Sequence, residues 1–193
     1  HRLLSGLVDL VYPKVCLSCK KKLDKSALDN FICQNCLLDI KRNVPPFCVS
    51  CGRGLKKTNI TKSICPDCIR KKLHFDSAFS PCVYTGVIKD LIHGFKYKNK
   101  DYLGLSLSKL MVEFIKEYNK PIDQMDFIIP IPLHKTRLRE REFNQAQILS
   151  NHIAKEFGKN VLTDVLLRTR DTKTQTDLEM DERILNVRNS FSV

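Results

Sequence analysis

The chain has 193 residues, of which 42% are hydrophobic and 28% are charged, so it can hold one medium domain or two small ones. Its net charge is +12, but residues 1–76 carry 15 basic against 6 acidic side chains, whereas residues 77–193 carry 18 against 15. No apolar run approaches the roughly 18 residues that a membrane-spanning helix requires, and the first residues lack the apolar core of a signal peptide. We therefore expect a cytoplasmic protein, and His1 in place of Met indicates a trimmed or incomplete N-terminus.

Residues 3–11 form a short apolar pattern with helical spacing that ends before Pro13. A helix of this kind can lie on a membrane surface, but its polar side carries only Ser5 and Asp9 and no basic cluster. We expect it to pack on the protein. A position at the periphery of the inner membrane stays the alternative.

Eight of the nine cysteines form four C-x2-C pairs: Cys16/Cys19, Cys33/Cys36, Cys48/Cys51 and Cys65/Cys68. The pairs are separated by 13, 11 and 13 residues, which divides the array into two similar segments, 16–36 and 48–68. A C-x2-C turn places two thiolates on one side of a tight knuckle, and two knuckles complete a tetrahedral zinc site. The spacing predicts a double zinc ribbon with two zinc ions, which are structural because four thiolates leave no open position for water.

Other interpretations of the array are weaker. Disulfides need an oxidising compartment, and a redox C-x2-C normally occurs once rather than four times in tandem. An interleaved, RING-like pairing is the main competitor, although it usually includes a histidine and there is none between residues 2 and 73. Bound zinc also lowers the net charge of residues 1–76 from +9 to about +5, because eight thiolates outweigh two metal ions.

The second part of the chain alternates between strand and helix patterns. In chain order we expect a strand at 79–84, helices at 87–95 and 103–118, a strand at 127–133, a helix at 144–157, a strand at 161–167 and a helix at 181–189. Such alternation predicts an α/β domain with a largely parallel sheet. The predicted organisation is a zinc-ribbon domain over 1–76 followed by this α/β domain over 77–193.

The predicted strand at 127–133 leads into a basic segment. Pro130 and Pro132 cannot donate to a sheet ladder, so the strand ends there and a loop follows. The loop contains five basic side chains: His134, Lys135, Arg137, Arg139 and Arg141. Guanidinium groups at the carboxyl end of a strand, just before a helix, favour phosphate or pyrophosphate. A solvated basic loop, balanced by Glu140 and Glu142, is the alternative.

Residues 130–145, PIPLHKTRLREREFNQ, resemble the P-V-P-L-(x)n-R-x3-R-G-F-N-Q signature of the ComF/GntX family. The segments Leu167-Arg-Thr-Arg170, Thr174-Gln-Thr176 and Arg183-x2-Asn186-x4-Phe191 are similar to later motifs of that family, in the same order. With the cysteine array, the resemblance covers essentially the whole chain.

The resemblance implies a double zinc ribbon joined to a type I phosphoribosyltransferase-like domain, whose ligand is phosphoribosyl pyrophosphate with Mg2+. It assigns the phosphate contacts to five residues: Arg137, Arg141, Asn144, Gln145 and, more weakly, Lys96. It also implies a role in DNA uptake during competence, with single-stranded DNA or the DNA-uptake machinery as further partners.

Two departures from the family pattern bear on activity. Glu142 stands where the signature has Gly, which places a carboxylate beside the expected anion site and removes backbone freedom. The Asp-Asp and Thr-Thr-Gly loop that holds the ribose phosphate in such domains is absent. We expect the chain as given to be catalytically inactive, and to be a fragment of a longer protein rather than a truncated relative. The alternative function is a zinc-ribbon module that binds single-stranded nucleic acid or docks a protein, with a degenerate second domain.

Overall fold

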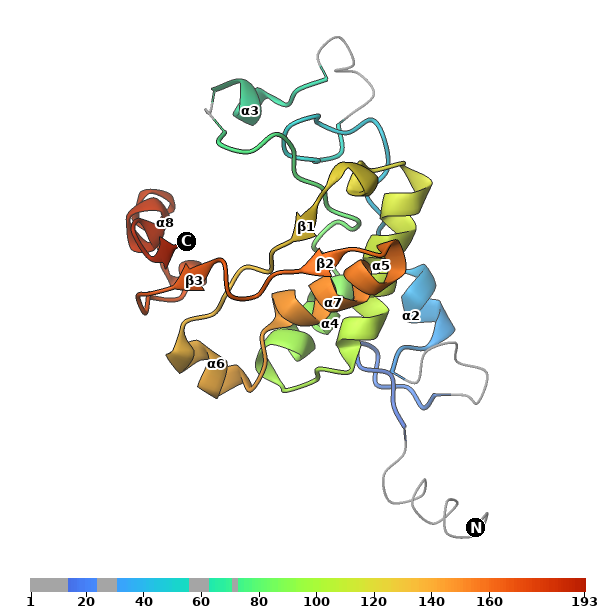
Figure 1. Cartoon of the computed structure of the whole chain (residues 1–193). Helices are drawn as coiled ribbons and strands as arrows, with labels where there is room; N and C mark the ends of the chain where they lie inside the picture. Colours follow the sequence, from blue (N-terminus) through green and yellow to red (C-terminus); the bar gives the residue numbers. More distant parts are fainter. Residues whose placement is uncertain (1–13, 24–30, 56–62, 71–72) are drawn as a thin grey trace. The chain divides into compact units, whose positions relative to one another are not determined.

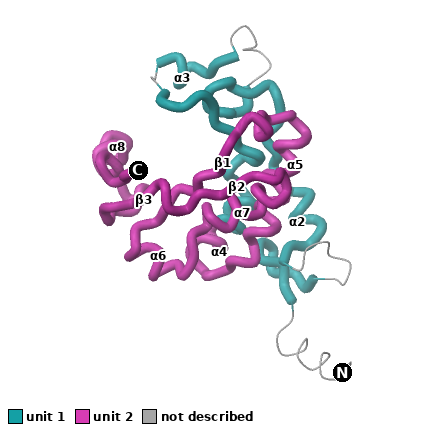
Figure 2. The backbone as a smooth tube through the Cα atoms, in the orientation of Figure 1, with its two compact units in different colours: residues 1–92 teal, residues 93–193 magenta. Residues whose placement is uncertain are grey.

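The computed structural model describes residues 14–23, 31–55, 63–70 and 73–193, so the helix expected at 3–11 lies outside the described residues (Figure 1). Two compact units divide the chain, residues 1–92 and 93–193 (Figure 2). The segment 77–92 belongs to the first unit here, and the domain boundary expected at 76/77 stays a prediction. Within the described ranges, no helix has the length and apolar character needed to cross a membrane.

Unit 1 repeats one small motif around the cysteines. Each half has a knuckle closed by an isolated antiparallel bridge, Val15 with Lys22 in the first and Phe47 with Gly54 in the second. A one-turn helix then starts beside the next cysteine pair in each half. These helices are α2 (Gln34–Leu38) and α3 (Pro66–Arg70). The chain therefore presents its four cysteine pairs in the two similar segments that the spacing predicts.

The segment after the second ribbon runs alongside both halves of unit 1. The amide of Val83 donates to the carbonyl of Lys41 at 2.9 Å, and the amide of Ala78 donates to that of Ser50 at 2.8 Å. The buried Asn43 side chain donates to the carbonyls of Gly52 and Ser80. The strand expected at 79–84 is therefore extended backbone with one bridge, from half-buried Cys82 to Arg42, rather than part of a ladder.

Unit 2 combines helices with two short sheets (Figure 1). Strand β1 (Phe127–Ile128) pairs in parallel with β2 (Asn160–Val161), and β3 (Leu167–Arg168) pairs antiparallel with β4 (Phe191–Ser192). The helices are α4 (Val87–Tyr97, which begins in unit 1), α5 (Leu103–Glu117), α6 (Lys135–Arg141), α7 (Gln145–Phe157) and α8 (Met180–Val187), with 3-10 turns η2 (Ile122–Gln124) and η3 (Gln175–Asp177).

The core of unit 2 lies where α5 packs on α7. Helix α5 buries one stripe at helical spacing: Leu103, Leu107, Leu110 and Phe114. A Cβ on Gly104 would lie 2.3 Å from Ile148 Cγ2, so the missing side chain lets the two helices approach closely. Between the parallel strands, α6 and α7 form the crossover that such a pair requires.

The α/β character is confirmed, but the sheet is smaller and more mixed than expected. One pair is parallel and one antiparallel, and the strand expected at 161–167 is two short strands separated by a turn. The expected basic loop is wrong in form, because residues 135–141 are helix α6. His134 caps this helix by accepting from the amide of Thr136 at 3.4 Å, and Arg137 pairs with Glu140 one turn on.

Gly52 and Gly86 offer a matched test of the packing in unit 1. Both have positive φ, +68° and +53°, but a Cβ at Gly52 would meet the carbonyl oxygen of Ala78 at 2.3 Å, whereas one at Gly86 would meet nothing within 4 Å. We expect Gly86→Ala to cost about 1–2 kcal/mol through backbone strain alone. Gly52→Ala should cost clearly more and lower the melting temperature of the zinc-loaded protein further. Equal melting temperatures would contradict the close approach of residue 78.

Candidate metal centres and anion site

The knuckles of unit 1 share one backbone geometry. In the first, the N–H of Cys16 donates to the carbonyl of Lys21, and the carbonyl of Cys16 accepts from the N–H of Lys20. In the second, Cys48 makes the same two bonds with Arg53 and Gly52. Lys20 and Gly52, at equivalent positions, have φ of 64° and 68°. This turn directs both thiols of a pair to the same side.

Each half gathers four thiols into one cluster. Cys16, Cys19, Cys33 and Cys36 form the first cluster, and Cys48, Cys51, Cys65 and Cys68 form the second. Within each cluster all sulfur atoms lie within 4.8 Å of one another. The Sγ atoms of Cys19 and Cys33 are 3.7 Å apart, as are those of Cys51 and Cys65. Four thiolates at 2.3 Å from one zinc have edges of about 3.8 Å, so both clusters fit a tetrahedral zinc ion.

The crowding of the thiols also favours a cation. Burial raises the pKa of Cys16, but backbone N–H groups of neighbouring residues outweigh it and hold this pKa at about 6. Burial and the surrounding thiols raise the pKa of Cys36 to about 12. Cys48 and Cys68 repeat the contrast at about 6 and about 12. Without a cation each cluster keeps protonated thiols, and zinc makes all four thiolates compatible. The clusters are consistent with two structural zinc ions.

In unit 2, Asn144 connects the start of α7 to the segment that follows β1. Its Oδ1 caps α7 by accepting from the amide of Ala146 at 2.9 Å, and its Nδ2 donates to the carbonyl of Ile131 at 3.1 Å. The side chain therefore ties the segment that leaves β1 to the start of α7. Just before it, Glu142 ends α6 with φ of 64°, so a residue with a side chain takes the left-handed position where the family signature has Gly.

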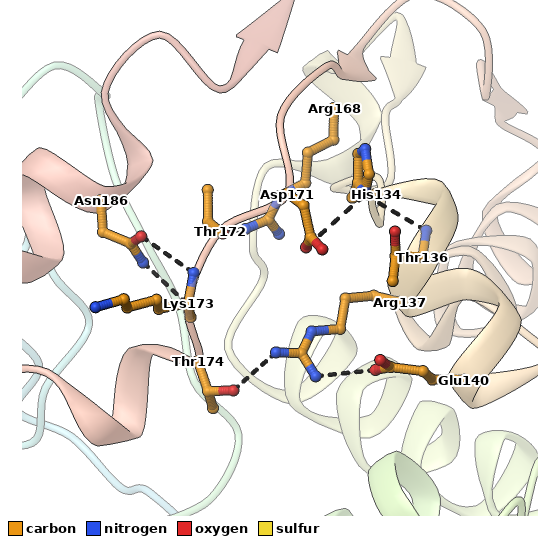
Figure 3. Close-up of polar contacts among 10 residues, drawn as sticks. All are labelled: His134, Thr136, Arg137, Glu140, Arg168, Asp171, Thr172, Lys173, Thr174 and Asn186. Carbon is orange, nitrogen blue, oxygen red and sulfur yellow. Dashed lines mark hydrogen bonds and ion pairs between the residues drawn. The ribbon is translucent and has the colours of Figure 1, made fainter.

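The two arginines of the predicted phosphate site have different surroundings. Arg137 donates to Glu140 and to the hydroxyl of Thr174, both at 2.9 Å (Figure 3). Arg141 donates to Oε1 of Gln145 at 3.3 Å, and its guanidinium lies 5.1 Å from the centre of the Tyr97 ring. The buried Gln145 in turn donates to the carbonyl of Phe95 at 3.3 Å, which connects α7 to α4.

Lys96 and Arg168 extend this group of cations. Burial, and then the charge of Arg141, lower the pKa of Lys96. Burial also lowers the pKa of Arg168; Asp171 opposes this effect, and the charges of Arg137 and Arg141 add to it. The fold thus brings together four cations from α4, α6 and β3, which we call the cation cluster: Lys96, Arg137, Arg141 and Arg168.

Carboxylates balance the cation cluster only in part. Arg137 has Glu140, and Asp171 lies near Arg168 but is also 3.8 Å from His134. In the part of the chain that the structure describes, no carboxylate lies within 4.0 Å of Lys96, Arg141 or Arg168. Arg137, Arg141 and Arg168 are half-buried, whereas Lys96 is exposed. Half-buried cations with an incomplete set of counter-charges favour an anionic ligand.

Comparisons with known proteins match the zinc ribbons to a known family and the chain to named relatives. Residues 7–73 match the double zinc ribbon domain family. Competence protein F of Haemophilus influenzae is 28% identical over 112 residues, which cover 57% of this chain and 49% of that protein. The DNA utilization protein YhgH is 26% identical over 110 residues in both Salmonella typhimurium and Escherichia coli K12, covering 56% of the chain and 48% of each relative. These matches support a relationship of the chain to the ComF family. No solved structure matches the chain.

The chain spans about half the length of the curated relatives it matches. Of the cation cluster, the sequence predicted Lys96, Arg137 and Arg141 as phosphate contacts, and Arg168 was not among them. The available signal was the motif Leu167-Arg-Thr-Arg170, whose two arginines the sequence does not distinguish. In the structure Arg170 donates to the carbonyls of Asn186 and Arg188 instead.

The metal content of single cysteine variants tests the two clusters. We expect two zinc ions per wild-type chain and one in Cys19→Ser or Cys51→Ser, because each loses one thiolate of a different cluster. Cys82→Ser belongs to neither cluster and should keep both ions. Elemental analysis after dialysis measures the ratio. Loss of zinc from Cys82→Ser, or an unchanged ratio in the other two, would contradict the ligand sets.

Proposed function

We propose that this protein binds phosphoribosyl pyrophosphate through unit 2 and acts in DNA uptake. The observation that carries the proposal is the cation cluster, whose side chains outnumber the carboxylates around them. The names of the relatives, Competence protein F and DNA utilization protein, support the process.

In this proposal Arg137 and Arg141 bind the pyrophosphate from one side. They lie four residues apart on α6, so their side chains share one face of the helix. A guanidinium can pair two N–H groups with two phosphate oxygens, which gives orientation as well as charge. Lys96 supplies a point charge, and its lowered pKa rises again when an anion arrives. Asn144 and Gln145 position the arginine-bearing helix end rather than neutralise charge.

Magnesium would arrive with the pyrophosphate as its complex, because the cation cluster offers few of the oxygen ligands that Mg2+ prefers. Phosphoribosyl transfer would also require groups for the ribose and its 5-phosphate, which the chain as given lacks in the Asp-Asp and Thr-Thr-Gly form. The proposal for this chain is therefore binding of the ligand rather than turnover.

Binding of single-stranded DNA by unit 1 is the second candidate function. Lys21 and Lys22 are exposed on the first ribbon. In the second ribbon Arg53 and Arg70 both pair with Asp67, at 2.8 and 3.2 Å, which reduces the charge they can offer to phosphates. This function predicts binding that weakens steeply with salt and is lost in Lys21→Gln plus Lys22→Gln. Binding that does not respond to salt, or no binding, would contradict it.

The phosphate site is tested by the double variant Arg137→Gln plus Arg141→Gln, titrated with phosphoribosyl pyrophosphate and Mg2+ by calorimetry. Each guanidinium makes charge-assisted bonds worth about 1.5–3 kcal/mol, so we expect affinity to fall by at least about 100-fold. Arg139→Gln removes one charge, half of what the double variant removes, from an exposed position of the same helix and should change affinity by less than about twofold.

The melting temperature of each variant separates lost contacts from lost folding, because Arg137 and Arg141 also bond within the protein. A double variant that melts like wild type and still binds the ligand equally well would overturn the assignment. Equal losses of affinity in Arg139→Gln and in the double variant would show that the ligand is attracted by the overall positive charge and not bound at this site.

A further inference from the structure

Arg168 has an unusual environment for an arginine in a small sheet. It lies in β3, directly opposite Phe191 of β4, and its guanidinium sits 5.4 Å from the centre of that ring. One end donates through Nη2 to the hydroxyl of the buried Thr172. Its Nε is buried and has no hydrogen-bond partner. A buried donor left without an acceptor costs about 1–3 kcal/mol, so its retention calls for an explanation.

The segment that follows β3 holds Arg168 and Arg137 near each other. Arg168 reaches Thr172 from β3, while Arg137 reaches Thr174 from α6 (Figure 3). Because the two threonines are two residues apart, their Cα atoms are at most about 7 Å from each other. Two guanidinium groups anchored this closely repel, which agrees with the lowering of the Arg168 pKa by Arg137.

A second buried donor lies next to this segment. Gln175 follows Thr174 directly, and its Nε2 is also buried without a hydrogen-bond partner. No other buried side-chain nitrogen or oxygen in the described part of the chain lacks a partner. The two buried donors without a partner, Arg168 Nε and Gln175 Nε2, therefore belong to residues on either side of the segment 172–174, which binds both arginines through its threonines.

We propose that Arg168 is a further ligand of the diphosphate group held by Arg137 and Arg141, and that it favours a diphosphate over a single phosphate. This inference rests on the proposed function. Arg137 and Arg168 enter from different elements, α6 and β3, so together they can bind two linked phosphoryl groups from two directions. A single phosphate offers fewer oxygens and a shorter span, so it pairs fully with one guanidinium fork and less completely with the second arginine.

A purely structural role for Arg168 leads to a different expectation. As a clip between Phe191 and Thr172, Arg168 would contribute to melting temperature and not to affinity. A ligand role contributes to affinity and to the discrimination between anions. The two roles are therefore separable by measuring both quantities on the same variants.

The test compares Arg168→Gln with Lys173→Gln, using pyrophosphate, orthophosphate and phosphoribosyl pyrophosphate with Mg2+. Lys173 is exposed in the same segment and points away from Arg137 in Figure 3, so its variant matches the loss of charge. We expect Arg168→Gln to weaken pyrophosphate binding about 10-fold or more and Lys173→Gln to weaken it less than about twofold. The preference for pyrophosphate over orthophosphate should fall only in the first variant.

Arg168→Lys keeps the charge but removes Nε and the fork, so we expect an intermediate loss, and this variant decides the matter if Arg168→Gln does not fold. Suppose that the wild type binds pyrophosphate, that Arg137→Gln plus Arg141→Gln abolishes this binding, and that the Arg168 variants bind as tightly as the wild type. That combination would overturn this inference alone. Wild type that binds neither pyrophosphate nor phosphoribosyl pyrophosphate would overturn the proposed function as well.

Discussion

Coordination of a metal by four thiolates is the interaction on which unit 1 depends. Between residues 14 and 70, the buried apolar side chains of the described part are the cysteines Cys16, Cys36, Cys48 and Cys65 and the isoleucines Ile32 and Ile40. Two isoleucines bury surface worth about 1.5–3 kcal/mol each, whereas a structural zinc site contributes about 10–16 kcal/mol of apparent binding free energy. The ligands are therefore also the core, and the metal decides whether this part of the chain folds.

The two knuckles need the same left-handed backbone conformation, at Lys20 and at Gly52, but in different surroundings. Lys20 takes the left-handed conformation at the cost of some strain, which a solvent-facing turn can carry. Gly52 takes the same conformation, and the backbone of Ala78 lies directly against it. A side chain at this position would therefore clash with that backbone in addition to straining its own φ. The difference comes from Asn43, whose side chain holds Gly52 and Ser80 together. Two equal ligand sets thus sit in unequal surroundings, because the second knuckle packs closely against the backbone of the segment that leads out of the ribbons.

Local sequence signals predicted the parts of the fold whose cause is local. Cysteine spacing gave both thiol clusters, and the periodic apolar stripe of α5 gave that helix to within one residue of its observed end. Strands were predicted less well because their pairing depends on distant partners. The strand expected at 127–133 begins at the predicted residue but is only Phe127–Ile128, and the one expected at 161–167 became parts of two different sheets. Helix α6 was missed because its basic composition suggested a loop, although His134 and the spacing of Arg137 and Glu140 are helix signals. The motif Leu167-Arg-Thr-Arg170 indicated the segment but could not distinguish Arg168 from Arg170, because an orphan donor exists only once the fold has buried it.

Net charge is a poor guide to where this protein would bind an anion. Unit 1 contains most of the basic excess, yet zinc-bound thiolates cancel part of it, and Asp67 neutralises Arg53 and Arg70 in part. Residues 77–193 have a net charge of only +3, but the fold brings four cations close together, and three of them are half-buried. Repulsion among them is an unfavourable energy that the unliganded protein carries and an anion would relieve. Because a ligand that binds only the folded state stabilises it, the same repulsion that weakens unit 2 alone would strengthen its response to a diphosphate.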